Sequence, residues 1–373
     1  MAVVTESFLP QINGVTNSVL RVCEHLGRRG HQALVVAPGS RSSIGPSAWH
    51  GARVVRMPGV DVPAYGLPVA YPWPGLTDIL RDFAPDVVHL ASPTLLGAQA
   101  LKSAQKLQIP TVAVYQTDLA SFAAMHGLSP ARRAIWSWLR GIHNQADVTL
   151  APSRHAVTEL AVHGIPGARL WPRGVDVHRF DPGHRDEALH RRLAPKGEVL
   201  VGYVGRLSLE KQVDLLAGLD RTPGLRVVVI GDGPQRSTLS RLLPGAHFLG
   251  QLDGEELAAA FATLDVFVHT GAHETFCQAV QEALASGVPV VAPASGGPLD
   301  LIEPGVTGLF YPGGDQARLH EAVRDLAGDG ERRVKMGQAA RGWVAGRDWE
   351  AVGDLLLDHY RAVAAARSAG VSA

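Results

Sequence analysis

The stretch HETFCQAVQEALASGVPVVAP, residues 273–293, contains a loop, a helical pattern and a strand-like run in direct succession. Its two glutamates, Glu274 and Glu282, are eight positions apart. If the helix begins between Phe276 and Gln278, Glu274 lies in the loop before it and Glu282 lies in its second turn. The run VPVVAP that follows has the apolar, β-branched character of a buried strand. Units of this kind are the building blocks of parallel α/β sheets.

The same alternation of apolar runs and amphipathic stretches continues on both sides of this segment. In the first half of the chain, helical patterns begin near Val15 and cover residues 75–83, 95–107 and 131–145. Strand-like runs occupy residues 2–7, 32–38, 52–58, 86–92, 111–118 and 147–153, and in the second half 198–205, 226–233, 246–252, 265–271 and 288–294. This βαβ rhythm predicts an α/β fold with two Rossmann-like domains that face each other across a cleft.

Length and composition set the domain organisation. A chain of 373 residues is long for one compact core, so two domains are expected. The stretch 171–198 is rich in Pro, Gly and charge, which is typical of a linker. We predict an N-terminal domain over 1–172, a linker over 173–198 and a C-terminal domain over 199–348. Residues 349–373 have a helical pattern, and packing of this helix back on the N-terminal domain is an arrangement that the sequence leaves open.

Charge and cysteine content exclude several classes of protein. The 35 basic and 35 acidic residues balance, so no global positive field recruits nucleic acid. The two cysteines, Cys23 and Cys277, lack CxxC spacing, which argues against a disulfide framework or a zinc knuckle. The sequence begins with an apolar strand and has no run near 18 apolar residues. The cytoplasm is therefore the simplest compartment.

Two cations follow a predicted strand in VLVGYVGRLSLEKQVD, residues 199–214. Arg206 stands directly after Gly205, and Lys211 follows five positions later. The carboxyl edge of a parallel sheet is where such folds bind ligands, and these cations suit the oxygens of a diphosphate. Glu282 can accept two hydrogen bonds from the vicinal hydroxyls of a ribose, which leaves Glu274 for a sugar. The combination indicates nucleotide-sugar chemistry.

At this point the sequence resembles a known family. The segments VGRLSLEK, HETFCQAVQEALASG, APASGGPLDLI and GVTGLF are similar to those of the retaining GT-B glycosyltransferases of family four, with the glutamate pair as its E-x7-E motif. The opening TESFLPQINGVTNSV resembles the N-terminal glycine loop of the family. Together with DVVHLASP, AVYQTD, RGVD and the HETFCQ variant, this opening gives the chain a closer resemblance to actinobacterial GDP-mannose-dependent α-mannosyltransferases that act on glycolipids.

The resemblance implies a role for each matching residue. Arg206 and Lys211 would bind the diphosphate, Glu282 the ribose and Glu274 the donor sugar. The remaining donor-binding positions would be the backbone of Thr275, Phe276 and Cys277, the loop at Gly14, and the base-binding stretch near Leu252. Glycine at position 14 has no Cβ and so permits close approach to phosphates.

The segment AVYQTD departs from the family pattern, since many relatives carry His where this chain has Gln116. Gln can donate and accept hydrogen bonds but does not protonate near neutral pH, so a histidine acid or base is excluded there. We expect Gln116 and Asp118 to orient the sugar. The resemblance also implies retention, with the leaving β-phosphate assisting the incoming hydroxyl. No DxD motif is evident, so we predict that no metal or other cofactor is needed.

A membrane-facing helix is a further hypothesis, for residues 129–147. Ile135, Trp138, Leu139 and Ile142 form a helical stripe that should face the core. Arg132, Trp136 and Arg140 form a second line, whose chemistry suits an interfacial helix on an anionic membrane. The competing interpretation packs the arginine stems on the indole at a domain surface. His126, just before this helix, is a candidate for the acceptor entry. Contact would then be peripheral, on the inner face of the plasma membrane.

Other functions remain as alternatives. An NAD-dependent dehydrogenase would need GxGxxG after the first strand, where the chain has PQINGVTNS. A UDP-sugar-dependent glycosyltransferase or a nucleotide-sugar epimerase would share the fold, and a non-catalytic sensor would not need the full set of cations and carboxylates. Guanine and uracil are not distinguished by any single residue. The expected partners are a nucleotide-sugar donor and a glycolipid or polyol acceptor.

Overall fold

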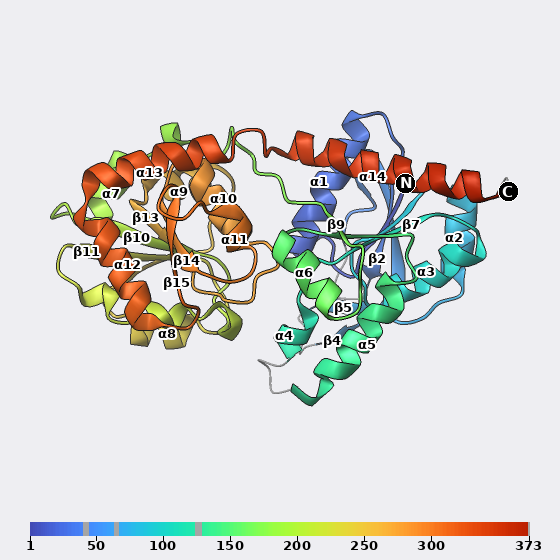
Figure 1. The fold of residues 1–373 in the computed structure, drawn as a ribbon, viewed down its shortest axis with the longest axis horizontal. Coiled ribbons are helices and arrows are strands. Elements are labelled where there is room, and N and C mark those ends of the chain that lie inside the picture. Colours follow the sequence, from blue (N-terminus) through green and yellow to red (C-terminus); the bar gives the residue numbers. More distant parts are fainter. Residues whose placement is uncertain (40–44, 63–66, 124–128, 372–373) are drawn as a thin grey trace. The chain divides into compact units, whose positions relative to one another are not determined.

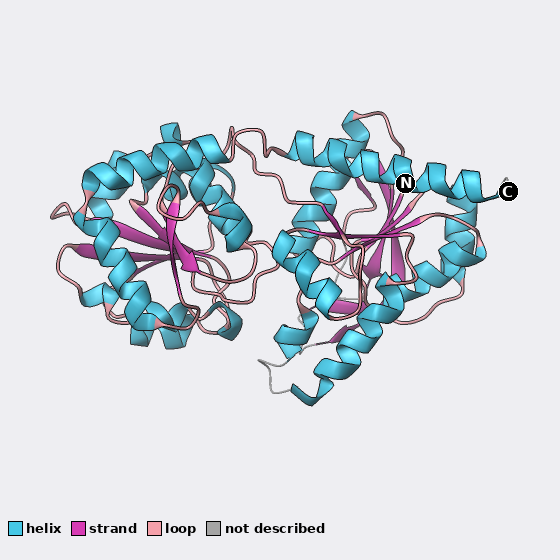
Figure 2. Cartoon of the chain, viewed as in Figure 1, coloured by secondary structure: helices cyan, strands magenta, loops and turns pink. Residues whose placement is uncertain are grey.

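The structure is a computed structural model, and it describes residues 1–39, 45–62, 67–123 and 129–371. The chain forms two compact units, Met1–Arg173 with Trp349–Ala373, and Gly174–Asp348. Each unit is built on a sheet of mainly parallel strands with helices on both faces (Figures 1 and 2). In the described part of the chain, no helix is both long and apolar enough to cross a bilayer. The predicted α/β class with two Rossmann-like domains is confirmed.

The first unit contains a nine-stranded sheet with the order β3-β4-β2-β1-β6-β7-β8-β9, in which β5 pairs with β4. Its strands are β1 (Ala2–Val4), β2 (Leu34–Gly39), β3 (Ala48–Trp49), β4 (Ala52–Val62), β5 (Leu67–Ala70), β6 (Val88–Leu90), β7 (Thr111–Val114), β8 (Val148–Ala151) and β9 (Arg169–Leu170). The pairings of β4 with β3 and β5 are antiparallel and the others are parallel. In the register, Val3 of β1 lies opposite Val35 and His89.

The helices of the first unit are α1 (Gly14–Arg28), α2 (Gly75–Phe83), α3 (Leu95–Lys106), α4 (Leu119–Ala123), α5 (Arg132–His143), α6 (Arg154–Val162) and α14 (Trp349–Val371), with a 3-10 turn at Ser129–Ala131. Because side chains alternate along a strand, Val3 packs toward α1 and α14 while Val4 packs toward α2 and α3. The C-terminal helix α14 belongs to this unit. The Trp171 indole donates to the Val352 carbonyl at 3.0 Å, and Tyr360 lies 2.7 Å from His89 Nδ1.

The second unit contains a fully parallel six-stranded sheet with the order β12-β11-β10-β13-β14-β15. Its strands are β10 (Val199–Val204), β11 (Leu225–Ile230), β12 (His247–Gly250), β13 (Val266–Val268), β14 (Val290–Pro293) and β15 (Gly308–Tyr311). Counted along the chain, this is the order 3-2-1-4-5-6 of a dinucleotide-binding fold. The helices are α7 (Glu187–Leu193), α8 (Arg236–Leu242), α9 (Gly254–Thr263), α10 (Gln278–Ala285), α11 (Pro298–Leu301), α12 (Gln316–Gly328) and α13 (Gly330–Trp343), with 3-10 turns at Pro182–His184, Leu209–Lys211, Val213–Leu216 and Leu219–Arg221.

The structure differs from the prediction of a linker over residues 173–198. Residues from Gly174 onward belong to the second unit and include α7, whose first turn is capped by Asp186. The segment is fixed by Asp265, which accepts from Arg185 at 3.1 Å and lies 2.9 Å from His190 Nε2. The charged residues that resembled a mobile linker in the sequence are therefore partners in specific ion pairs.

Candidate functional site

The order of the second sheet defines where a ligand can bind. The strand order reverses between β10 and β13, and parallel sheets bind ligands at the carboxyl ends of the strands that flank such a reversal. The loop after β10 carries Arg206 and Lys211, and the loop after β13 carries Glu274. The two cations and the first glutamate of the motif are thus brought to one edge of one sheet.

The backbone of the loop after β10 is hydrogen-bonded to the strand before it, and the Arg206 side chain is exposed. The Tyr203 hydroxyl donates to the Arg206 carbonyl at 3.1 Å. The Arg206 side chain is exposed, and among the described residues it forms no ion pair. An exposed guanidinium without a carboxylate partner suits a phosphate.

Two glycines of the neighbouring β11 loop explain how closely the backbone packs at this point. A Cβ on Gly231 would lie 1.9 Å from the Gly205 carbonyl oxygen, and a Cβ on Gly233 would lie 2.4 Å from that of Leu207. The segment GDG therefore supports the Arg206 loop, and its glycines are required by contact with that loop.

An ion pair joins the two loops. The Lys211 ammonium donates to Glu274 Oε1, and 26% and 18% of the two side chains remain exposed. Burial by itself would lower the pKa of Lys211, but the Glu274 carboxylate outweighs this effect and raises it. Burial likewise opposes ionisation of Glu274, but Lys211 keeps its pKa below the ordinary value. Both groups are therefore charged at neutral pH.

His269 and Cys277 lie against this pair. His269 Nε2 is 3.6 Å from Glu274 Oε1, and burial lowers the pKa of His269 to about 4, so the imidazole is neutral. Cys277 is buried and has a φ of 89°, a left-handed conformation that is uncommon for a residue with a side chain. Burial raises the pKa of its thiol. Helix α10 starts at the next residue, Gln278, within the predicted range.

A glycine pair from the loop after β14 fixes the position of Glu274. The Gly297 N–H donates to the Glu274 carbonyl at 2.7 Å. A Cβ on Gly297 would lie 1.8 Å from the Phe276 carbonyl oxygen, and a Cβ on Gly296 would lie 2.5 Å from that of Glu274. The two segments are in backbone contact, so neither position has room for a side chain.

The other predicted donor residues of this unit lie on the same edge or beside it. Glu282 is half-buried in the second turn of α10, Thr275 is half-buried and Phe276 is buried in the apolar core. Leu252 follows β12, and its side chain packs against that core. Any contact of Leu252 with a base would therefore involve its backbone more than its side chain.

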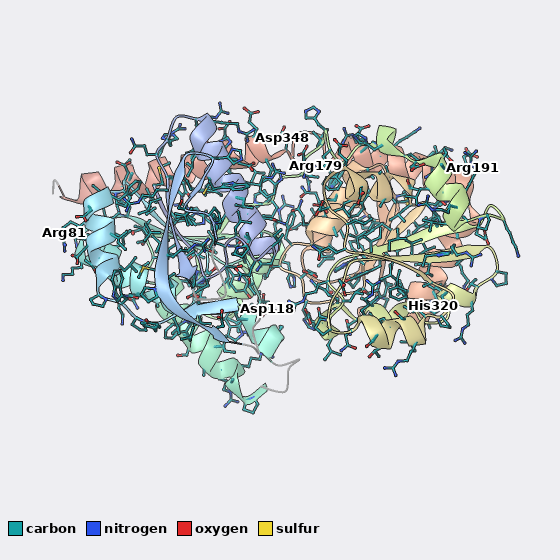
Figure 3. The ribbon with its side chains drawn as sticks, turned by 180° about the vertical axis from the view of Figure 1, so that it is seen from behind. Arg81, Asp118, Arg179, Arg191, His320 and Asp348 are labelled. Carbon is teal, nitrogen blue, oxygen red and sulfur yellow. The ribbon has the colours of Figure 1, made fainter. Side chains whose placement is uncertain are left out.

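Gln116 and Asp118 are placed in the first unit. The Gln116 amide donates to the Ala91 carbonyl and accepts from the Arg173 guanidinium, so both ends of the side chain have protein partners. Asp118 Oδ1 accepts from the Ser121 N–H at 2.9 Å, which caps the short helix α4 (Figure 3). Their predicted role toward a sugar stays a prediction.

The predicted exposed line on α5 is wrong. Trp136 is only 4% exposed and stacks on His163 with 3.8 Å between ring centroids, whereas Trp138 is 44% exposed. The apolar side chains cover too wide an arc of this helix for its spacing to decide which face is buried. Arg140 is half-buried and donates to the His163 carbonyl at 3.1 Å, while Arg132 is exposed. His126 lies outside the described residues.

Comparison with known proteins gives the family. Residues 12–179 match the model described as Glycosyltransferase Family 4, and residues 185–343 match that of Glycosyl transferases group 1. The chain is 50% identical over 372 residues to a GDP-mannose-dependent alpha-mannosyltransferase of Mycobacterium tuberculosis, which covers 99% of this chain and 98% of the relative. A protein of the same name from Corynebacterium glutamicum is 47% identical, with 98% and 89% covered. The chain belongs to glycosyltransferase family 4.

Solved structures of other proteins agree with the fold of this family 4 glycosyltransferase. The structure of Anabaena HepE in complex with UDP superimposes with a TM-score of 0.78, covers 97% of this chain and 99% of its own, and is 18% identical. Sucrose-phosphate synthase from Thermosynechococcus elongatus gives a TM-score of 0.79 with 98% and 99% covered, at 21% identity. At such identities the likeness is one of fold, and the fold is GT-B.

Sequence reasoning missed two features of the site in this glycosyltransferase. The first feature is His269, which lies within the strand-like run 265–271 and is linked to Glu274 by no spacing signal. The second feature is the glycine pair of APASGGPLDLI, since SGGP after a strand signals a tight backbone approach. The SGGP pattern is therefore a sequence signal that predicts contact of Gly296 and Gly297 with another loop.

Gly14 offers a test that separates function from folding. A Cβ there would meet no atom within 4 Å, and Gly14 opens α1 behind the Asn13 cap. Gly14→Ala should therefore leave the free energy of unfolding unchanged or raise it by up to about 1 kcal/mol through helix propensity. If the family role holds, donor KM should rise by about tenfold or more in initial-rate assays. Unchanged donor KM would remove Gly14 from the donor site.

Proposed function

We propose that this glycosyltransferase transfers an α-mannosyl group from GDP-mannose to a lipid-linked sugar or polyol, with retention at the anomeric carbon and without a metal ion. The identity of about 50% over nearly the whole chain to proteins named for this activity is the observation that carries the proposal. The residues at the sheet edge are chemically suited to such a donor.

Each part of the donor has a counterpart at the sheet edge. The exposed Arg206 guanidinium and the Lys211 ammonium would bind the diphosphate. Glu282 would accept the ribose hydroxyls and Glu274 those of the mannose. Because Lys211 already holds the Glu274 carboxylate, the sugar and the diphosphate would be oriented by one connected pair of charges.

The proposed independence from metal ions rests on the positive charges of Arg206 and Lys211. The diphosphate gains negative charge as it leaves, and preorganised cations at that position lower the barrier. Arg206 and Lys211 would take this role, so EDTA should not reduce transfer.

Calorimetric titration with GDP, UDP and ADP in the presence of EDTA tests the donor. Tight binding of GDP alone would support GDP-mannose as the donor. A preference for UDP would indicate a UDP-sugar as the donor instead. Product analysis with and without a lipid acceptor then distinguishes transfer from epimerisation and from binding without turnover.

Arg206→Ala should weaken GDP and donor binding together. Loss of a hydrogen bond to a charged group costs about 1.5–3 kcal/mol, or roughly 10- to 150-fold in affinity. Arg221→Ala is the matched control, since Arg221 is also exposed but lies at the end of the 3-10 turn that precedes β11, at the amino edge of the same sheet. Normal GDP affinity in Arg206→Ala would contradict the phosphate contact.

We also propose that the acceptor is reached at the inner face of the plasma membrane. With Trp136 buried, the exposed surface of α5 includes Arg132 and Arg133 in its first turn and Trp138 in its second, a combination that suits anionic headgroups. Flotation with anionic vesicles should recover the protein, and Trp138→Ala together with removal of the two arginines should reduce recovery. Equal recovery would exclude this face as the contact.

A further inference from the structure

Glu274 and the two side chains beside it, His269 and Cys277, have the composition of a transition-metal site. The ligand atoms of His269, Glu274 and Cys277 all lie within 4.8 Å of one another. Imidazole, carboxylate and thiolate are the usual protein ligands of zinc, at bond lengths of about 2.0–2.3 Å. Tetrahedral ligand atoms are then about 3.3–3.8 Å apart, so small side-chain rotations would close the cluster around an ion.

His269 gives independent evidence that this cluster is poised for a ligand. Its ring is 3% exposed, and neither ring nitrogen makes a full hydrogen bond with a described residue: Nε2 lies 3.6 Å from Glu274 Oε1, and the backbone of Gly271 is the other polar neighbour. Buried polar atoms are nearly always satisfied, so two unsatisfied nitrogens on one ring call for an explanation.

Cys277 is a residue with a side chain at a backbone conformation that favours glycine. At a φ of 89° the chain favours glycine, and the side chain is accommodated against this preference. The thiol nevertheless lies within the cluster, next to a carboxylate that is paired with a lysine. Soft thiolate and imidazole ligands select zinc-like ions over magnesium.

We propose that His269, Glu274 and Cys277 bind a Zn²⁺-class cation, and that this ion inhibits transfer by taking the Glu274 carboxylate from Lys211. Binding forms metal–nitrogen, metal–oxygen and metal–sulfur bonds and releases the thiol proton to solvent. Lys211 keeps its proton and loses its partner, and no group is oxidised or reduced. The inhibition, unlike the binding, rests on the proposed role of Glu274 toward the donor.

Cobalt spectroscopy tests the binding without any need for activity. Full-length protein is stripped with EDTA, freed of chelator and titrated with Co²⁺. We expect one equivalent to give the near-ultraviolet thiolate-to-cobalt band and the intense visible bands of tetrahedral cobalt, both of which Zn²⁺ should abolish. The Cys277→Gly variant should lose the thiolate band and at least about tenfold in affinity. Glycine suits this backbone conformation, so the variant should fold.

Two further variants make the result decisive. Cys23→Ala removes the other thiol, which is buried in the first unit, and should leave the spectrum unchanged. His269→Ala should weaken Co²⁺ binding at least about tenfold while Cys277 remains. Absence of a thiolate band in the wild type, or its persistence in Cys277→Gly, would overturn the site.

The inhibition is measured separately. Micromolar Zn²⁺ should reduce mannosyl transfer by the wild type and EDTA should restore it, with each variant compared with its own metal-free rate. Zinc binding that is seen by spectroscopy but leaves transfer unchanged would overturn the inhibition. A failure of the proposed donor chemistry would leave the cobalt result standing, so the two proposals fail independently.

Discussion

Glu274→Ala is expected to reduce transfer by at least about 100-fold, because the donor sugar loses the carboxylate that orients it. Binding of GDP should stay close to that of the wild type, since Lys211 would remain available to the diphosphate. Initial rates and calorimetry with GDP on the same preparation measure the two quantities. Glu274→Gln keeps the shape and can still hydrogen bond, so it should retain more activity than alanine. Unchanged turnover in Glu274→Ala would refute the role.

Glu274→Ala should also lower the free energy of unfolding. A second ion pair of the same unit provides a control for this loss of stability. Glu274 and Lys211 are partly exposed, so loss of the carboxylate should cost about 2 kcal/mol, between the values for surface and fully buried pairs. Glu198 pairs with Arg226 at the amino end of β10 with similar exposure. Glu198→Ala should destabilise comparably and leave transfer unchanged. Equal loss of transfer in both variants would show that the effect is structural.

The sign of the pH dependence follows from the lowered pKa of Glu274. The pair contributes its stability above the unfolded-state pKa of about 4.3 and loses it as the pH falls through the lower folded-state value. Denaturation on acidification should therefore be less steep in Glu274→Ala than in the wild type.

Gly297→Ala is expected to give the largest loss of stability. Its Cβ would lie 1.8 Å from the Phe276 carbonyl oxygen, which is a backbone atom and cannot rotate away. Overpacking of this kind costs about 1–3 kcal/mol, and loss of the hydrogen bond to the Glu274 carbonyl adds about 1 kcal/mol. Because the clash displaces the segment that carries Glu274, transfer should also be lost. Thermal unfolding and initial rates measure both effects.

Gly342→Ala is the control for Gly297→Ala. Gly342 lies within α13 of the same unit, and a Cβ there would meet no atom within 4 Å. Alanine should raise stability by up to about 1 kcal/mol through helix propensity and leave transfer unchanged. Wild-type stability and activity in Gly297→Ala would mean that the loops after β13 and β14 are not in the contact described.

The elements of the site were predictable where the signal is local. The helix after Glu274 begins at Gln278, inside the predicted range, because the loop, apolar helix face and following strand are all encoded within 21 residues. The orientation of α5 was not predictable. Both Trp136 and Trp138 are apolar, and rings from other segments, His163 and Tyr115, decide which of them is buried.

The structure differs from the linker predicted over residues 173–198 for a similar reason. Their composition is that of a linker, but Arg185 and His190 find their partner, Asp265, more than 70 positions away. Composition reports the residues that a segment carries and gives no information on distant partners.

The sequence by itself determined the βαβ pattern, the family and the residue types of the site, since periodicity and motifs are properties of short segments. Only the tertiary structure decided that Lys211 binds Glu274 across 63 positions, with His269 and Cys277 against the pair. The reason is the strand order: β10 and β13 become neighbours although two strands lie between them in the chain. That adjacency is fixed by the burial of both sheet faces, which depends on the whole unit, so no local pattern encodes it.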